Sequence, residues 1–241
     1  MVTGGAYIAN GLYNADCITA MRTMPNECVD MVLTDPPYNI NFVPQRTAER
    51  GAILNDNLSA ADFEKLLDDY FAECYRLLKP DTFAISFMSW ATIPAFEKAI
   101  RAAGFQIKSM PIWVKNNFGI GYYTRPQYEP MYLAIKGNPP PPDTAISDVL
   151  NYPRVVKQVH TCEKPMPLLQ RLIGTFSHEG DVIFDGFAGG GVQPLLPPAN
   201  CGVNIFVLNS IKITSILRHR VSKTNLRKRR FCTINGRGAR R

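Results

Sequence analysis

The residues whose types best suit chemistry are Asp35-Pro36-Pro37-Tyr38, which follow the apolar run 31–33 and Thr34. A carboxylate and a backbone carbonyl that both accept hydrogens from an exocyclic amine would favour a tetrahedral nitrogen with a free lone pair. Pro36 has no N–H and a fixed φ, so its peptide group presents an acceptor without a competing donor. Tyr38 could stack on a base that has left its duplex. The tetrapeptide alone also fits a plain strand-to-loop turn with a surface tyrosine.

A second group of residues, Asp185-Gly186-Phe187, opens the glycine-rich run GFAGGG at 186–191. Glycines after a strand let the backbone approach a ligand closely and tolerate positive φ. The run lacks the GxxxxGK[ST] pattern, which excludes a phosphate-binding P-loop. A glycine-rich loop without a ligand is the alternative interpretation.

Two shorter pieces carry further candidate residues. Asp16 lies in the stretch Asn-Ala-Asp-Cys at 14–17, and Lys164-Pro165 follow His-Thr-Cys-Glu at 160–163. A surface turn and a helix entry with an early proline explain these two pieces equally well. Neither piece is diagnostic by itself.

The elements that must position these residues alternate along the chain. The expected strands cover residues 28–34, 83–87, 105–114, 131–135 and 182–185, and the expected helices cover 59–78, 93–103 and 167–176. Strands that alternate with helices predict an α/β fold, a doubly wound and mostly parallel sheet with helices on both faces. Ligands bind at the carboxyl edge of such sheets. The proline-rich segment 137–159 interrupts the alternation and is expected to be an exposed excursion.

Composition narrows the class of protein. With 241 residues, 46% of them hydrophobic, the chain suits one globular domain with a substantial core. Its apolar runs are far shorter than the roughly 20 residues of a membrane span, and no signal peptide is recognisable at the N-terminus. The six cysteines form no CxxC pair and no metal-ligand grouping with the three histidines. We therefore expect a cytoplasmic protein with reduced cysteines, no membrane association and no bound metal.

In their order along the chain, the pieces resemble a known family, the β-class DNA amino-methyltransferases that use S-adenosylmethionine, with the permuted arrangement of that class. The matching pieces are NADC at 14–17, CVD at 28–30, DPPY at 35–38, RLLKPDTFAISF at 76–87, IWVKNN at 112–117, QYEPMYLAIKG at 127–137, HTCEKP at 160–165 and GDVIFDGFAGGG at 180–191. The resemblance covers roughly residues 8–191. An aspartate at the first DPPY position is more similar to the adenine-N6 group than to the cytosine-N4 group.

The resemblance implies a Rossmann-like methyltransferase fold and a role for each matched residue. Asp35, Pro36, Pro37 and Tyr38 would form the target-amine site. The cofactor site would be shaped by Asp16, Lys164, Pro165, Asp185, Phe187, Gly189 and Gly191. Transfer would be direct and in line from a sulfonium, which needs positioning rather than a metal or a covalent intermediate.

Partners are implied by the same resemblance. Double-stranded DNA would be the substrate, and the excursion 137–159 would be a short target-recognition segment. The resemblance leaves open a homodimer and a restriction-enzyme partner.

The C-terminal segment departs from the family pattern. After Asp185 the chain has 56 residues without an acid, although they hold 11 of its 27 Lys and Arg. Prolines occur where the family has a helix, and Asn209 stands near an expected glutamate. A shifted reading frame can restore both features through the degeneracy of the code, so we predict that residues 192–241 are translated out of frame. The expected catalytic domain is 1–191, followed at 192–241 by an aberrant basic tail that is out of frame or disordered, so this part of the fold is expected to be disrupted.

This prediction bears on activity. A missing ribose contact should weaken cofactor binding, so a weak or inactive adenine methyltransferase is expected. Two alternatives remain at this point: methylation of the cytosine N4 amine, and a DNA-binding remnant without catalysis.

Overall fold

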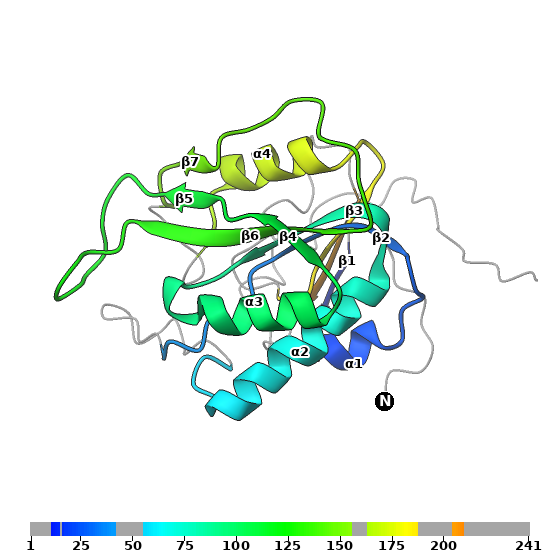
Figure 1. The fold of residues 1–241 in the computed structure, drawn as a ribbon, viewed down its shortest axis with the longest axis horizontal. Helices are drawn as coiled ribbons and strands as arrows, with labels where there is room; N and C mark the ends of the chain where they lie inside the picture. Colours follow the sequence, from blue (N-terminus) through cyan, green and yellow to red (C-terminus); the bar gives the residue numbers. More distant parts are fainter. Residues whose placement is uncertain (1–10, 15, 42–54, 156–162, 188–203, 210–241) are drawn as a thin grey trace, which may run out of the picture.

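The computed structural model describes residues 11–14, 16–41, 55–155, 163–187 and 204–209. These residues form three layers, with a central sheet between helices on both of its faces (Figure 1). The predicted α/β class with helices on both faces is confirmed.

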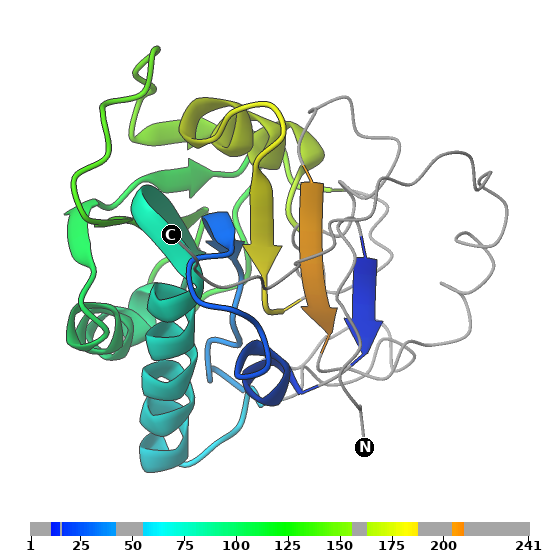
Figure 2. The same ribbon diagram turned by 90° about the vertical axis from the view of Figure 1, so that its right-hand side faces the viewer.

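The described part of the chain contributes nine strands to the sheet, in the order β1-β9-β8-β2-β3-β6-β5-β7, with β4 also paired to β6. Their bounds are β1 Gly11–Asn14, β2 Val29–Thr34, β3 Leu78–Phe87, β4 Gln106–Ser109, β5 Ile112–Val114, β6 Tyr128–Lys136, β7 Val149–Asn151, β8 Val182–Asp185 and β9 Asn204–Asn209. Neighbours from β1 to β3 are parallel, and β6 runs antiparallel to β3, β4 and β5. Figure 2 shows β8, β9 and β1 side by side with their arrows pointing the same way.

Within the described ranges, four α-helices and one 3₁₀ turn cover the sheet. Their bounds are α1 Cys17–Met21, α2 Ala60–Leu77, η2 Trp90–Thr92, α3 Ile93–Ala102 and α4 Met166–Phe176. Ser59 caps α2, since its side chain accepts a hydrogen bond from the Asp62 backbone N–H at 3.1 Å. Helices α1, α2 and α3 lie on one face and α4 lies on the other (Figure 1).

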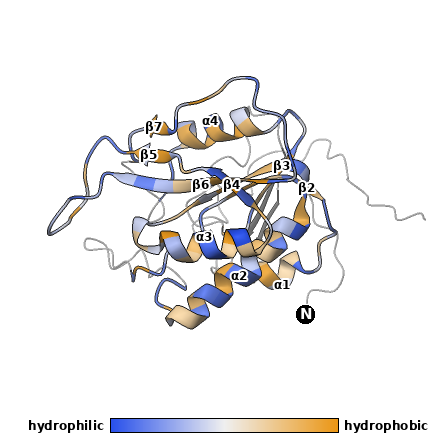
Figure 3. Ribbon diagram, viewed as in Figure 1, coloured by the Kyte–Doolittle hydropathy of each residue, from blue (hydrophilic) through white to orange (hydrophobic). Residues whose placement is uncertain are grey.

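Strand β2 shows how the core divides between the two faces. Val32 packs in the cluster formed with α2 and α3, whereas Met31 and Leu33 pack in the cluster formed with α4. Successive side chains of a strand point to opposite faces, so a strand buried on both faces is mostly apolar, as Met31, Val32 and Leu33 are. Hydrophobic and hydrophilic residues alternate along α2 in Figure 3, as expected for a helix with one buried face.

Two sequence predictions need correction. The strand expected over 105–114 is two strands, β4 and β5, which are separated at Met110-Pro111. Proline cannot donate to a strand ladder, and the Pro111 carbonyl accepts from the Met131 backbone N–H at 2.9 Å. The segment 137–159 is not exposed throughout, because β7 pairs with β5 and its Leu150 is buried.

The predicted tail contains one described element. Strand β9 pairs in parallel with β8 on one side and with β1 on the other. Part of the segment predicted to be disordered and aberrant thus has a place in the sheet. The domain boundary at residue 191 and the out-of-frame origin of residues 192–241 stay predictions.

A search for membrane spans over the described residues found no helix that is both long and apolar enough to cross a bilayer.

Candidate active site

The candidate residues gather at one edge of the sheet. Asp35 directly follows β2 and Asp185 ends β8, the parallel neighbour of β2, so both carboxylates lie at the carboxyl edge. Glu129 is near the start of β6, which runs antiparallel to β3 with Met131 opposite Phe87 at the end of β3. Its side chain therefore reaches the same edge. Lys164 lies just before α4, and its side chain contacts Asp35 and Glu129 from the layer that contains α4.

The Asp35 carboxylate is held on both of its oxygens. Lys164 Nζ lies 2.5 Å from Oδ2, and the Tyr38 hydroxyl donates to Oδ1 at 2.5 Å. The Lys164 ammonium also lies 3.2 Å from the Tyr38 hydroxyl oxygen and 5.0 Å from the centre of the Phe87 ring. The Lys164 side chain has no exposure to solvent, and the Asp35 side chain is 13% exposed. This carboxylate is therefore oriented by direct contacts and only narrowly open to a ligand.

A second carboxylate extends this network. Glu129 Oε2 lies 3.2 Å from Lys164 Nζ, an ion-pair contact without hydrogen-bond geometry. Glu129 Oε1 accepts a hydrogen bond from Lys115 Nζ at 2.6 Å. Two ammonium groups thus alternate with two carboxylates from Lys115 to Asp35. Pairing of this kind is the condition under which charged groups can be buried.

The pKa values of the Asp35 and Glu129 carboxyl groups are shifted in opposite directions. Burial raises the pKa of Asp35; Lys164 opposes this rise, and the Glu129 charge adds to it. Burial also raises the pKa of Glu129, but Lys164 and Lys115 outweigh it and leave that pKa below its usual value. The surroundings therefore favour the charged form of Glu129 more than that of Asp35.

The segment after Tyr38 is anchored as well. The Asn39 side chain accepts from the Leu58 backbone N–H at 2.6 Å and donates to the Leu58 carbonyl at 3.2 Å. The Asp56 carboxylate accepts from the Ile40 backbone N–H at 3.2 Å. Asn39 has a φ of 55°, a left-handed conformation that asparagine tolerates. The exit from the DPPY turn is thus fixed by contacts distant in sequence.

Asp185 occupies a separate, fully buried position. Its Oδ1 accepts from the Thr34 hydroxyl at 3.0 Å and from the Phe187 backbone N–H at 3.0 Å. The Tyr70 hydroxyl joins this group, because it lies 2.7 Å from Thr34 Oγ1 and accepts from the Gly186 N–H at 3.2 Å. The backbone that leaves β8 is thereby held as far as Phe187.

Gly186 is required by this packing. A Cβ at this position would lie 2.5 Å from the Tyr70 ring, which is itself buried. The Tyr70 ring also packs against Phe187, with ring centres 4.7 Å apart. The start of the glycine-rich run is therefore shaped by close approach to α2.

The other predicted site residues have local roles that the structure shows. Asp16 caps α1 and accepts from the Thr19 backbone N–H at 2.8 Å. Pro165 begins α4, and its carbonyl accepts from the backbone N–H groups of Leu168 and Leu169.

The remaining predicted site residues lie within the DPPY turn and the glycine-rich run. Pro36 is buried and Pro37 is half-buried. Gly189 and Gly191 lie outside the described residues.

The resemblance implies a place for Lys164 beside the cofactor, which stays a prediction; in the structure its ammonium contacts Asp35, Tyr38 and Glu129. Glu129 and Lys115 were inside family-like segments but received no role. Their signal was a charged residue bordering an apolar strand, which is too common to indicate a site. Within the described part of the chain no group of three or more His, Cys, Asp and Glu side chains could hold a metal ion.

Comparison with known proteins decides the family. A family model for N6/N4 methyltransferases, described as DNA methylase, matches residues 29–192. A relative named "Putative methylase YubD", from Escherichia coli K12, is 33% identical over 73% of this chain and 74% of its own length. The chain belongs to the DNA methylase family. This chain is also 27% identical to the DNA adenine methyltransferase YhdJ of Escherichia coli K12, over 75% of this chain and 72% of that protein.

A solved structure agrees on the fold of the methylase. The crystal structure of an M1.HpyAVI–SAM complex superposes with a TM-score of 0.62 and covers 84% of this chain and 93% of that one, at 19% identity. The predicted resemblance to methyltransferases is thus confirmed by sequence and by fold. The matched range ends one residue beyond the glycine-rich run, so it includes both the DPPY turn and that run.

Proposed function

We propose that this chain is a DNA adenine-N6 methyltransferase that takes its methyl group from S-adenosylmethionine. The observation that carries the proposal is the Asp35 carboxylate, held by Lys164 and Tyr38 at the carboxyl edge of the sheet in a chain of the DNA methylase family. Aspartate at this position supports adenine as the base, by the resemblance described above.

The donor set suits S-adenosylmethionine, which carries positive charge on its sulfur and its amino group. Asp35 follows β2 and Asp185 ends β8, the parallel neighbour of β2, and Gly186 brings backbone close to the same edge. Asp16, Asp185 and Phe187 would hold the cofactor, together with Lys164, Pro165, Gly189 and Gly191 as the resemblance implies. When bound, the cofactor supplies a methyl group on a positively charged sulfur.

The chain's own residues would orient and deprotonate the target amine. Asp35 would accept a hydrogen from the amine, since each carboxylate oxygen keeps a further lone pair beside its bond to Lys164 or Tyr38. Transfer would break the bond between the methyl carbon and sulfur and leave that sulfur as a neutral thioether, and the methylated nitrogen would carry a surplus proton that Asp35 would take. The raised pKa of Asp35 favours that transfer. Lys164 would keep the carboxylate aimed throughout.

The target base must leave the duplex to reach this site. The Asp35 side chain is mostly buried, and a stacked base cannot bring its amine into contact with it. Tyr38 would then stack on the extruded base.

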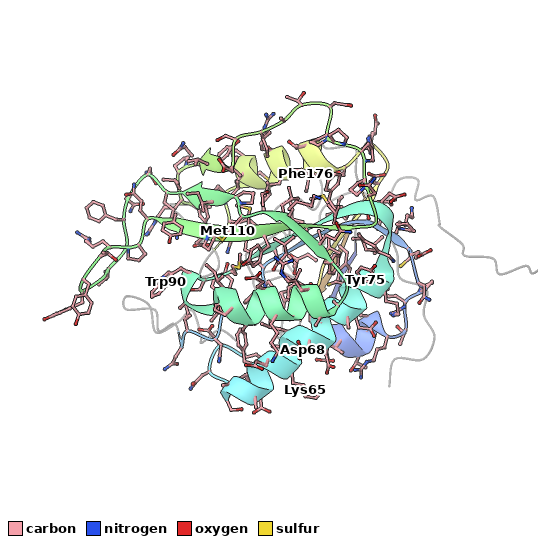
Figure 4. The ribbon with its side chains drawn as sticks, viewed as in Figure 1. Lys65, Asp68, Tyr75, Trp90, Met110 and Phe176 are labelled. Atoms are coloured by element: carbon pink, nitrogen blue, oxygen red, sulfur yellow. The ribbon has the colours of Figure 1, made fainter. Side chains whose placement is uncertain are left out.

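Methyl transfer to unmethylated DNA tests the proposal. The full chain is incubated with S-adenosylmethionine, and the nucleosides of the DNA are identified by mass spectrometry. We expect N6-methyladenine from the unaltered chain and a loss of at least about a hundredfold for Asp35→Ala, because the amine then lacks its positioned acceptor. Asp68→Ala, an exposed position on α2 labelled in Figure 4, is the matched control and should change nothing.

Other products of the same assay decide against the proposal. N4-methylcytosine would assign the chain to the cytosine group. DNA binding without any methylated base would make it a remnant that grips DNA without catalysis. A homodimer and a restriction-enzyme partner stay predictions.

A further inference from the structure

The loop between β5 and β6, residues 115–127, stands out from the rest of the molecule. It projects beyond the sheet in Figure 1, and Figure 4 shows its side chains extending away from the other elements. At its tip Tyr122 and Tyr123 are each 94% exposed, and Ile120 is 75% exposed. Large side chains in this state lack the burial that usually stabilises them.

Hydrogen bonds within the loop nevertheless give it a defined backbone conformation. The backbone N–H of Lys115 donates to the Gln127 carbonyl at 2.8 Å, and the N–H of Gly119 donates to the Pro126 carbonyl at 2.7 Å. Gly121 has no room for a side chain, because a Cβ there would lie 1.8 Å from the Thr124 carbonyl oxygen. The two backbone hydrogen bonds and the close approach at Gly121 hold the loop in one conformation.

Aromatic packing within the loop supports that shape. The Arg125 guanidinium lies 3.9 Å from the centre of the Phe118 ring, and Arg125 Nε donates to the Gly119 carbonyl at 2.9 Å. Tyr122 and Tyr123 meet edge to face, with ring centres 5.1 Å apart. The two tyrosines are thus presented together at the tip.

The base of the loop is joined to the target-amine site. Lys115, its first residue, bonds to Glu129, which contacts Lys164, which in turn bonds to Asp35. The position of the loop is therefore set by the same network that orients the catalytic candidate.

The composition of the loop favours a partner with phosphate groups. Residues 115–127 contain Lys115 and Arg125 and no acidic residue, but Lys115 is paired with Glu129, so Arg125 is the loop's cation that remains for a ligand. A guanidinium beside exposed aromatic rings matches phosphates beside base faces. A second copy of this chain fits less well, because a stable protein interface needs about 1,200 Å² or more and a loop tip offers little area.

We propose that Tyr122 and Tyr123 enter the DNA duplex beside the target base and stack in the gap that this base leaves. The inference rests on the proposed function in taking duplex DNA as the partner. An extruded base leaves its neighbours unstacked, and aromatic wedges offset that loss in proteins that deform DNA.

Photocrosslinking tests the contact without requiring activity or a known recognition sequence. The full chain is irradiated with a mixed-sequence duplex that contains 5-iodouracil, and crosslinked peptides are identified by mass spectrometry. We expect adducts on Tyr122 or Tyr123. Adducts on other peptides with none in 115–127 would overturn this inference but leave the proposed function standing.

Affinity for the same duplex provides a second measurement. Tyr122→Ala/Tyr123→Ala should weaken binding roughly tenfold, the effect expected when base stacking is lost. Tyr122→Phe/Tyr123→Phe keeps both rings and should bind as the unaltered chain does. Met110→Ala, an exposed apolar residue outside the loop, should also leave affinity unchanged.

The alanine variant should fold, since both tyrosines are almost fully exposed. If it changes the sedimentation coefficient of the free protein while DNA affinity stays the same, the loop joins two copies of the chain and the inference is wrong. The methylation assay with Asp35→Ala is independent of this result, so failure of the proposed function and failure of the loop contact are distinguishable.

Discussion

Lys164 is the residue through which the candidate site is connected. Its ammonium is withdrawn from solvent and contacts Asp35 and Glu129, which come from different strands. A buried charge with two anionic partners is stabilised as a group, and removal of one member leaves the others uncompensated. The site should therefore respond to each change in a predictable direction.

Removal of the Lys164 charge should raise the pKa of Asp35 further, because Lys164 is the main influence that opposes the rise caused by burial. In Lys164→Met the acid limb of the pH profile for kcat should therefore move to higher pH. A drop of about tenfold in kcat at the optimum is also expected from the lost charge-assisted hydrogen bond. Steady-state methylation rates across pH measure both effects.

Removal of the Glu129 charge should have the opposite effect on the pH profile. Glu129 raises the pKa of Asp35, so Glu129→Gln should move the acid limb to lower pH. The two variants control for each other, since both disturb the same network. Shifts in the same direction would show that general loosening, and not charge, governs the profile.

At the scale of elements, a tyrosine of α2 bonds to the backbone that leaves β8. Tyr70 of α2 bonds to Thr34 at the end of β2 and to the Gly186 N–H after β8. A helix on one face thus sets the path of the loop that carries the expected cofactor residues. Its contacts lie 36 and 116 residues away in sequence.

Gly186→Ala tests this contact. The added methyl would collide with a buried ring, and overpacking of this kind costs roughly 1–3 kcal/mol. The free energy of unfolding in urea should fall by that amount, and cofactor binding should weaken.

Gly174→Ala in α4 is the matched control for the Gly186 variant. A Cβ at Gly174 meets nothing within 4 Å, so this variant should be stabilised by up to about 1 kcal/mol. Equal losses in both variants would contradict the steric explanation.

For the whole molecule, strand β9 of the C-terminal segment extends the parallel part of the sheet. Strand β9 lies between β8 and β1, at the place where the family-like pattern expects an acid-bearing strand. The chain has Asn209 at its end, where the resemblance expects a glutamate nearby. The strand thus occupies its position without the expected charge.

Restoration of the reading frame should therefore strengthen cofactor binding. A regained carboxylate with hydrogen bonds to ribose hydroxyls contributes about 1.5–3 kcal/mol, which is tenfold or more in affinity. Calorimetry with S-adenosylmethionine on both chains measures the difference. Early stop codons in the shifted frame of the gene, or equal affinities, would refute the out-of-frame origin.

The sequence by itself determined the fold class, most elements, the DPPY turn and the family. These follow from short-range patterns: period and punctuation locate strands and helices, and the order of motifs identifies a lineage. Asp35 and Tyr38 could be proposed as site residues because their types and spacing are unusual together. The helix α1 and the strands β1 and β7 were missed, since elements of three to five residues carry too little pattern to be recognised.

The tertiary structure decided which charges meet. Lys164 is 129 residues from Asp35 in sequence, and Glu129 and Tyr70 each act at the site through contacts between distant elements. No local pattern encodes such a pairing, because it arises only when the carboxyl end of β2, the start of the antiparallel strand β6 and the segment before α4 meet at one edge of the sheet. The four residues Asp35 to Tyr38 were enough to predict a chemical role for Asp35. Its pKa and its orientation depend on residues that only folding brings next to it.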